Sequence, residues 1–458
     1  MVFLLLTFFI ARCLGDVQFG KFSFALTFSS MFLIFADLGL TMLAVREVSR
    51  DRSRADSYMS NIIFIKLCLS LVTWFMVFLL INILGYPPDT KRVVYILMLA
   101  LIINSFVEAF GAVFRAYEEM GYVSMLMMVQ KFVGAAGGIA ALAAGYKLES
   151  VACAYLAGSL LSGAAGYAIM SRKFVKPGFK LEPEFCVKII KSALPVGVSI
   201  FFSGIYFRVD IVLLSLLKGD AMVGWYSAAY KPMEALMVIP AGFTGALFPV
   251  FSNLYRTAGE SLPFTCEKAI KILFIFILPV AAGTTMLAGK LITLFYGSGF
   301  SNAVIALKIL IWASVLIFVN FVLTQLLIAI DRQKYNAVFA VVCAVFNLSL
   351  NLLFIPSAGY VAASIITVLT EALLFIMCFA VISKHLGVIP LHRVIYKPLI
   401  TCGLMCIALY YVRGLALFLS VPAAALVYLL CLKLVRALDE KDYRILKSLF
   451  KGGTATVL

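Results

Sequence analysis

The sequence consists of long apolar stretches separated by short polar connections. Nearly all the stretches approach the length of about 20 residues that an α-helix needs to cross the hydrocarbon core of a bilayer. Inside a bilayer a helix satisfies its backbone hydrogen bonds within one segment. The sequence therefore predicts an all-α, polytopic membrane protein with about fourteen transmembrane helices, at residues 1–12, 20–43, 59–84, 93–115, 121–145, 149–170, 193–217, 224–251, 270–295, 303–330, 335–355, 358–383, 397–412 and 415–432.

The connections between successive predicted spans lie alternately on the two sides of the membrane, and basic residues are divided unevenly between these two sides. Of the 38 lysines and arginines, 25 fall on one side or in the tail from Lys433, 8 fall on the other side, and five lie within the apolar stretches. Cytoplasmic loops carry an excess of Lys and Arg. The richer side, which holds both chain ends, is therefore predicted to be cytoplasmic, and we expect a multi-pass protein of the inner or plasma membrane.

The composition excludes several other classes of protein. Apolar residues make up 64% of the chain and charged residues 13%, whereas charged residues form about a quarter of a soluble domain. The net charge of +16 could suggest nucleic acid, but short basic loops beside membrane spans are explained by orientation and by contact with anionic lipids. No nucleic-acid partner is expected. Most of the ten cysteines lie inside apolar runs and do not form a disulfide framework.

The first apolar stretch is too short to span a bilayer, because Met1 to Ala11 gives only about half of the roughly 20 residues needed. A signal peptide is the alternative, but no basic region precedes the stretch and no small-x-small cleavage site follows it. We interpret it as the end of a longer first helix. The upstream reading frame is then expected to encode roughly a dozen further residues, because the corresponding later helix is longer.

An internal repeat supports that interpretation. The motif Gly15-Asp16-x-x-x-Gly20-x-Phe22-Ser23-x-Ala25 is echoed 204 residues later by Gly219-Asp220-x-x-x-Gly224-x-Tyr226-Ser227-x-Ala229. Each copy forms the predicted outer turn between an odd-numbered and an even-numbered helix. Six helices separate the copies, so the two halves have the same orientation and form a parallel repeat, as in transporters with two lobes around a central path.

The repeat predicts the domain organisation. We expect an N-terminal six-helix lobe whose first helix is truncated, a cytoplasmic linker, a second six-helix lobe, two additional helices and a cytoplasmic tail. These segments cover residues 1–170, 171–192, 193–384, 385–432 and 433–458, respectively.

Several short motifs, taken in order, resemble a known family. They are Leu14-Gly15-Asp16-x-x-x-Gly20-x-Phe22, Ala36-Asp37-Leu38-Gly39-Leu40 with Arg46-Glu47, Arg208-Val209-Asp210, Ala228-Ala229-Tyr230-Lys231 and Phe248-Pro249. The pattern is similar to that of the polysaccharide-biosynthesis (Wzx-like) flippases of the multidrug/oligosaccharidyl-lipid/polysaccharide exporter superfamily. It covers nearly the whole chain, and the short first helix departs from it.

This resemblance implies a function as well as a fold. It implies two six-helix lobes with two extra C-terminal helices, and alternating access that moves a lipid-linked oligosaccharide from the cytoplasmic to the outer leaflet. The implied substrate is a polyprenyl-pyrophosphate-linked glycan. The implied partners are this glycan and membrane lipids, with a glycan polymerase or glycosyltransferases as candidate protein partners.

Charged side chains inside the first predicted lobe are candidates for a functional site. A charge near the bilayer centre costs at least about 2.5–3.5 kcal/mol, so it normally faces protein or water. Asp37, Lys66 and Glu108 are expected at similar depths, roughly 10 Å from the cytoplasmic face, where they could form a mixed-charge cluster in a cavity. Mutual pairing that merely joins helices is the alternative to substrate binding. Lys131 lies nearer the midplane with no evident partner, which favours a substrate role.

The second predicted lobe holds a different set of charges. Arg208 and Asp210 lie two residues apart, about 200° apart around a helix, so they cannot form a simple pair. Arg208 and Lys231 have comparable depths and could converge on a pyrophosphate, because a guanidinium binds its oxygens bidentately and an ammonium adds a point charge. Lys231 and Glu234 can instead pair on one helix face.

Two further ionisable residues lie within the predicted spans. Glu371 lies near the middle of the twelfth span, where it could hold a proton, pair with a cation, or remain a neutral acid bonded to a neighbour. Lys308 lies near the outer end of its helix, and its ammonium is expected to snorkel to the interface.

The sequence offers little for catalysis. Its two histidines, His385 and His392, lie seven residues apart in one connection without matching carboxylates, which argues against a metal site. No nucleotide-binding loop is present, and we expect no enzyme activity and no cofactor. Two alternatives to a flippase remain: a cation-coupled drug or small-molecule antiporter of the same superfamily, and a non-transporting membrane scaffold for glycan enzymes.

Overall fold

The computed structural model describes residues 2–176, 178, 182–257, 261–387, 389–435 and 437, and the regular secondary structure of these residues is entirely helical. The α-helices are α1 (Val2–Asp37), α2 (Leu40–Arg50), α3 (Ala55–Ile83), α4 (Pro88–Ala116), α5 (Met120–Ala143), α6 (Leu148–Lys173), α7 (Pro183–Lys218), α8 (Asp220–Leu236), α9 (Val238–Thr257), α10 (Ser261–Tyr296), α11 (Ala303–Ala329), α12 (Gln333–Leu386), α13 (Leu391–Val412) and α14 (Leu417–Leu434). Two short 3₁₀ turns, η1 (Arg52–Arg54) and η2 (Ser298–Phe300), join α2 to α3 and α10 to α11.

The helices account for the predicted spans. Across the described residues, 11 helical segments are long and apolar enough to cross a membrane, and α1 and α12 each cover two predicted spans. Both long helices change direction at one glycine with positive φ, Gly15 (φ 78°) in α1 and Gly359 (φ 55°) in α12. The all-α, polytopic fold class is therefore confirmed.

The second predicted span, 20–43, is wrong at its end. Helix α1 stops at Asp37, and α2 begins at Leu40 as a separate short helix. Leu38 and Gly39 between them adopt left-handed conformations, with φ of 45° and 82°. A right-handed helix cannot continue through such residues, and glycine adopts this conformation at little cost.

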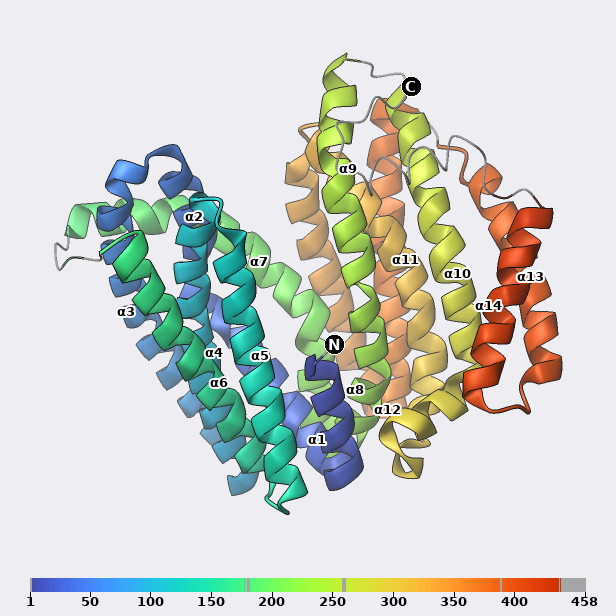
Figure 1. Ribbon diagram of the computed structural model, residues 1–458, viewed down its shortest axis with the longest axis horizontal. Helices are drawn as coiled ribbons and strands as arrows, with labels where there is room; N and C mark the ends of the chain where they lie inside the picture. The colour runs from blue at the N-terminus through green and yellow to red at the C-terminus, as the bar shows by residue number, and fades with distance from the viewer. Residues whose placement is uncertain are drawn as a thin grey trace. The chain divides into compact units, whose positions relative to one another are not determined.

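The chain folds into two compact units, Met1–Gly224 and Trp225–Leu458, and each is described by itself. In unit 1, α4, α5 and α6 pack together, and α1 contacts α3, α4, α5 and α7. The first part of α7 runs across one end of this unit beside α2 (Figure 1). Helix α7 thus packs on the first unit although the repeat assigns it to the second lobe, and the lobe boundaries drawn from the repeat remain a prediction.

Unit 2 is organised around α10, α11 and α12. One apolar core joins these helices to α13 and α14. Tyr428 of α14 donates a hydrogen bond to the carbonyl oxygen of Ile275 in α10 at 2.7 Å. The two C-terminal helices therefore belong to the packed body of unit 2.

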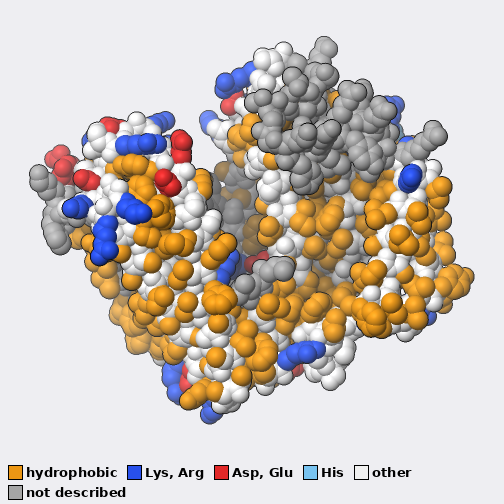
Figure 2. Space-filling model, viewed as in Figure 1, with side chains coloured by type: hydrophobic (Ala, Val, Ile, Leu, Met, Phe, Trp, Pro, Cys, Tyr) orange, Lys and Arg blue, Asp and Glu red, His pale blue; other side chains and the backbone are white. Residues whose placement is uncertain are grey.

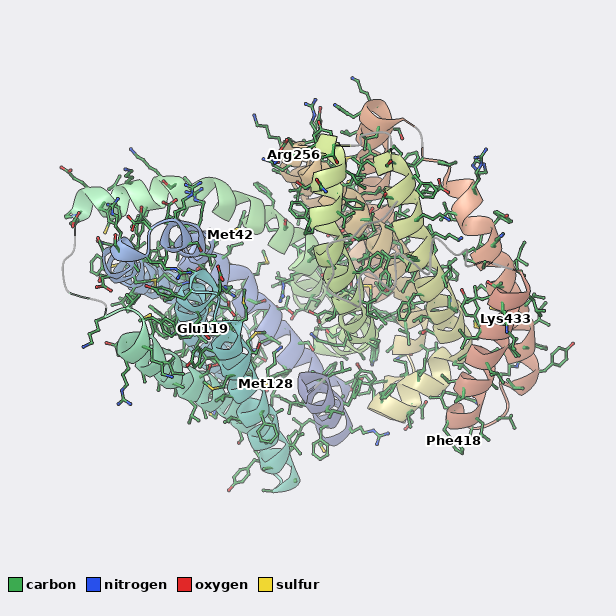
Figure 3. All side chains as sticks on the ribbon, turned by 45° about the horizontal axis from the view of Figure 1, so that its top comes forward. Met42, Glu119, Met128, Arg256, Phe418 and Lys433 are labelled. Carbon is green, nitrogen blue, oxygen red and sulfur yellow. The ribbon has the colours of Figure 1, made fainter. Side chains whose placement is uncertain are left out.

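The surfaces of both units suit a bilayer. Hydrophobic side chains cover the flanks of each unit, whereas Lys, Arg, Asp and Glu gather towards the ends (Figure 2). Large apolar side chains that are more than half exposed include Phe75 of α3, Leu353 of α12 and Phe418 of α14, the last of which is labelled in Figure 3. A soluble monomer rarely exposes so much contiguous apolar surface, so the protein is an integral membrane protein.

Candidate functional site: charged side chains within the helices

A buried lysine lies at the junction between α1 and α2. The Lys66 side chain, from α3, is 0% exposed and forms an ion pair with Asp37 at the end of α1. Thr41, in the first turn of α2, donates to Asp37 Oδ1 at 2.5 Å and accepts from Lys66 Nζ at 3.0 Å. Helix–helix pairing, which the sequence left open for Asp37 and Lys66, is therefore present, and a substrate role for either stays a prediction.

The helix break places these groups together. Because α1 ends at Asp37, its last backbone carbonyls point towards the junction, where a cation is favoured by the helix dipole. Lys66 supplies that cation from a neighbouring helix, and Asp37 compensates the charge of its ammonium. Burying the two charges costs free energy, and removing either partner would leave the other charge uncompensated.

Glu108 forms its ion pair with Arg115 and not with the predicted partner Lys66. Its Oε2 accepts from Arg115 Nη2 at 3.1 Å, within α4, and the same nitrogen donates to the Glu108 carbonyl oxygen at 3.2 Å. The Glu108 carboxylate still interacts electrostatically with Lys66. The expected three-residue cluster is thus an Asp37–Lys66 pair beside a more exposed Glu108–Arg115 pair.

Lys131 lies on an exposed, methionine-rich face of α5. Met127, Met128 (Figure 3) and Phe132 are its exposed neighbours. In the part of the chain that the structure describes, no carboxylate lies within ion-pair distance of Lys131. A cation in such a place requires water or an anionic ligand, and a substrate role for Lys131 stays a prediction.

Arg208 of α7 reaches α1. Its Nη1 donates to Ser30 Oγ at 2.6 Å, and Ser30 in turn donates to the carbonyl oxygen of Thr27 at 2.8 Å. The guanidinium has five N–H donors, so this bond uses one of them. No ion pair between Arg208 and a described carboxylate is found.

Asp210 lies two residues from Arg208 on α7. Its side chain is buried, and Oδ1 accepts from the backbone N–H of Ile211 at 2.8 Å. A buried carboxylate two residues from the arginine can position α7 without neutralising the guanidinium.

Lys231 forms the local pair that the sequence offered as an alternative. Its Nζ lies 2.6 Å from Glu234 Oε2, three residues along α8. Because Arg208 belongs to unit 1 and Lys231 to unit 2, their convergence on one anion stays a prediction.

Glu371 belongs to a buried polar network. The sequence offered a hydrogen bond to a neighbour as one alternative for Glu371, but it did not identify the asparagines that take part. Asn320 of α11 donates through Nδ2 to Glu371 Oε2 at 2.8 Å and to its carbonyl oxygen at 3.0 Å. Asn347 donates to Thr370 at 3.2 Å, and Asn351 donates to Asn347 at 2.8 Å. The available signal was two asparagines one helical turn apart in an apolar run, because such groups need partners in a membrane interior.

The described residues contain no group of three or more His, Cys, Asp and Glu side chains arranged to hold a metal ion. What the helices do place within the membrane-spanning region is a set of cations and buried acids. That chemistry suits binding of an anion and movement of charge.

The chain is similar to known transporter families. The model of the polysaccharide biosynthesis protein family matches residues 1–255. The chain belongs to this family. A second model, MatE, matches residues 195–353, so the two matches overlap over residues 195–255 of this family member.

Curated relatives of this polysaccharide biosynthesis family member include two named transporters. The probable low-salt glycan biosynthesis flippase Agl15 of Haloferax volcanii is 25% identical over 372 residues, covering 81% of this chain and 77% of the relative. The putative O-antigen transporter of Shigella flexneri is 25% identical over 390 residues, covering 80% of this chain and 90% of the relative.

Solved structures show the fold. The lipid II flippase MurJ in an inward closed conformation superposes with a TM-score of 0.79 at 16% identity, covering 94% of this chain and 95% of that structure. An inward-facing multidrug resistance MATE transporter of the MOP superfamily superposes with a TM-score of 0.72 at 16% identity, covering 84% and 94%. The family member therefore has the MurJ/MATE-like transporter fold.

Proposed function

We propose that this protein is a flippase that moves a polyprenyl-pyrophosphate-linked oligosaccharide from the cytoplasmic to the outer leaflet for cell-surface polysaccharide biosynthesis. The family match carries the proposal, and the names of the glycan flippase and O-antigen transporter relatives support it. Alternating access is the mechanism that a repeat of two lobes favours.

The charged side chains can serve such a substrate. Arg208 and Lys131 are the leading substrate contacts, because each is a cation without an ion pair to a described carboxylate. Arg208 presents the geometry that binds pyrophosphate oxygens bidentately. Lys231 is paired with Glu234, and Lys66 is paired with Asp37. Each lysine can bind the substrate only if it releases its carboxylate partner.

The acids fit coupling and positioning roles. Asp210 would hold α7 so that Arg208 faces the substrate. Glu371 is buried with Asn320 beside its carboxylate, an environment in which binding of a proton or cation can change the packing of α11 and α12. Charge movement at this site would then link transport to an ion gradient.

We place the basic-rich side, with both termini, in the cytoplasm of a cell membrane. A basic rim there would attract a lipid pyrophosphate made on that side. Glycosyltransferases and a glycan polymerase are the protein partners that would supply and consume the glycan.

A cation-coupled drug or small-molecule antiporter is the second candidate. The MatE match over residues 195–353 favours it, and the buried Glu371 would then be the coupling acid. An antiporter does not need Arg208 or Lys131, so these cations separate the two functions.

Replacing Arg208 tests the proposal. In cells that lack other flippases for the glycan, Arg208→Ala is expected to lower surface glycan about ten- to a hundredfold at equal protein abundance, because charge-assisted hydrogen bonds contribute about 1.5–3 kcal/mol. Arg208→Lys should restore part of the export, since it keeps the charge and loses the fork geometry. Surface glycan is measured by lectin binding, and protein abundance by immunoblot.

The controls use the other lysines. Lys308→Ala is expected to leave export near normal, and Lys231→Ala should lower it less than Arg208→Ala because Lys231 already pairs with Glu234. Normal export in Arg208→Ala, Lys231→Ala and the double variant would rule out the cationic substrate site and favour the antiporter or scaffold.

A further inference from the structure

Helix α5 of unit 1 carries a lysine at its centre. Lys131 lies 11 residues from the first residue of α5 and 12 from the last, which is about 16–18 Å from either end at 1.5 Å per residue. A lysine near a helix end can extend its ammonium to the membrane surface, but the centre of a span is out of reach. The Lys131 side chain is exposed, so its ammonium needs water or an anion at that depth.

Another face of α5 is fixed on α6. Ser162 donates to the carbonyl oxygen of Leu126 at 3.0 Å, and Gln130 Nε2 donates to Ser159 Oγ at 3.2 Å. A Cβ atom built on Gly158 would lie 2.6 Å from the carbonyl oxygen of Gln130, so the two backbones are in direct contact there. Helix α5 is thus a rigid support that holds its exposed face in place.

Thioether and aromatic side chains lie beside the ammonium on the exposed face. Met127 and Met128 precede Lys131 by four and three residues, so their Cβ atoms lie about 5–6 Å from that of Lys131 on the same side of the helix. Both are exposed, as is Phe132, and Met128 is labelled in Figure 3. Methionine adapts to irregular apolar shapes, so this surface fits a branched, flexible chain next to an anion.

Two kinds of lipid combine a phosphate with an apolar chain: the phospholipids of the bilayer and a polyprenyl phosphate. Phospholipid phosphates stay at the surfaces of a hydrocarbon core about 30 Å thick, so they lie about 15 Å from the centre of a span. The phosphates of a lipid that is carried across the membrane pass this depth. Charge and depth together therefore favour the transported lipid as the occupant.

We infer that the exposed face of α5 binds the lipid carrier of the substrate, with the Lys131 ammonium on the phosphates and with Met127, Met128 and Phe132 on the isoprene units next to them. The inference rests on the proposed flippase function and extends it, because it assigns recognition of the prenyl chain to named residues. The isoprene unit bonded to the phosphates lies one helical turn from the ammonium, where the two methionines are. This face recognises the carrier and not the glycan.

Binding of a carrier without a glycan tests the inference. The full chain is placed in phosphatidylcholine nanodiscs, and bound geranylgeranyl pyrophosphate is counted by native mass spectrometry. Lys131→Gln is expected to weaken its binding about tenfold or more, because a charge-assisted contact is lost. Replacing Met127 and Met128 together with Ala should weaken it about tenfold through lost apolar contact and leave the inhibition constant of inorganic pyrophosphate unchanged.

Met42→Ala is the matched control and should bind the probe as the wild type does. Met42 of α2 is 63% exposed and lies one turn from Arg46, a cation that Glu47 already pairs. The inference is overturned if the double methionine variant, or Lys131→Gln, binds geranylgeranyl pyrophosphate as tightly as the wild type. Displacement of the probe by an equal concentration of phosphatidylglycerol would also overturn it, since the face would then bind any anionic lipid.

Exposed positions tolerate substitution, so the methionine variant should fold, and it decides the test alone if Lys131→Gln does not reach the membrane. The measurement requires no transport, so the inference and the proposed function can fail separately. Loss of export in Arg208→Ala with normal probe binding in the methionine variant keeps the flippase and rejects the α5 face. Normal export in the Arg208 and Lys231 variants with weakened binding in the α5 variants does the reverse.

Discussion

Lys66 is a fully buried lysine, so its environment bears strongly on stability. Its ammonium is 0% exposed, whereas the Asp37 side chain is 26% exposed and also hydrogen-bonded to Thr41. Removing one partner leaves the other charge uncompensated, and that penalty grows with burial. The two partners therefore differ in what their removal costs.

We expect Asp37→Asn to destabilise the protein by about 3–5 kcal/mol, because it leaves a fully buried ammonium with an amide. Lys66→Met should cost less, since the Asp37 carboxylate that remains is partly exposed and keeps Thr41. Thermal unfolding of the detergent-solubilised protein measures both. Equal losses, or a larger loss for Lys66→Met, would contradict this account of the junction.

Glu108→Gln is the control for that measurement. The Glu108–Arg115 pair has a 40% exposed carboxylate, and exposed pairs contribute about 0–1 kcal/mol. A small change in unfolding temperature is expected.

At the residue scale, the sequence predicted which charges are unusual but not all of their partners. Asp37, Lys66 and Glu371 stand out because charges are rare in apolar spans. The partner of Arg208 is Ser30, which lies 178 residues away in the sequence, and Asn320 bonds Glu371 from another helix. Contacts between residues so far apart in the sequence depend on helix packing that periodicity does not encode.

Among the helices, the C-terminal pair depends on an unusual tether. Lys290 near the end of α10 donates to the carbonyl oxygens of Arg413 and Leu415 at 2.5 and 2.6 Å. These carbonyls lie in the α13–α14 turn, where a helix end leaves acceptors unsatisfied. The ammonium supplies two hydrogen bonds to the turn from outside the pair.

Lys290→Met should loosen that turn while leaving the apolar core of unit 2 intact. We expect hydrogen exchange at residues 413–417 to rise about tenfold, the effect of losing charge-assisted bonds of about 1.5–3 kcal/mol. Lys308→Met, on α11, is the matched control because no described group pairs with it. Unchanged exchange in Lys290→Met would mean that apolar packing alone holds the turn.

At the element scale, the apolar stretches predicted most helices but not how they join. The turn at Gly15 takes a single residue where the sequence suggested a connection of several, because one left-handed glycine suffices to start a new helix. The break at Leu38 and Gly39 was hidden inside an apolar run, since Leu38, whose φ is 45°, carries no turn signal.

For the whole molecule, the sequence predicted the fold class and the repeat, because bilayer thickness fixes helix length and the repeat leaves similar turns. It did not predict that α7 packs on unit 1, where α1, α2 and α3 contact it. The lobe that a helix corresponds to in the sequence repeat need not be the unit on which it packs. Apolar helix faces of similar composition do not specify which unit a helix contacts.

The distribution of charge predicts the orientation of the protein in the membrane, and a direct measurement tests this prediction. Single cysteines at Ser53 and Lys176 in a cysteine-free background are expected to be shielded from an impermeant thiol reagent in intact cells, and one at Asp89 should react. Ser53 and Lys176 are exposed and the Asp89 side chain is 42% exposed, so protection would report the side of the membrane and not burial. Permeabilised cells provide the control, in which all three positions should label. The 25 to 8 division of basic residues makes the opposite orientation unfavourable, and labelling of Lys176→Cys from outside would show that the basic-rich face is the outer one.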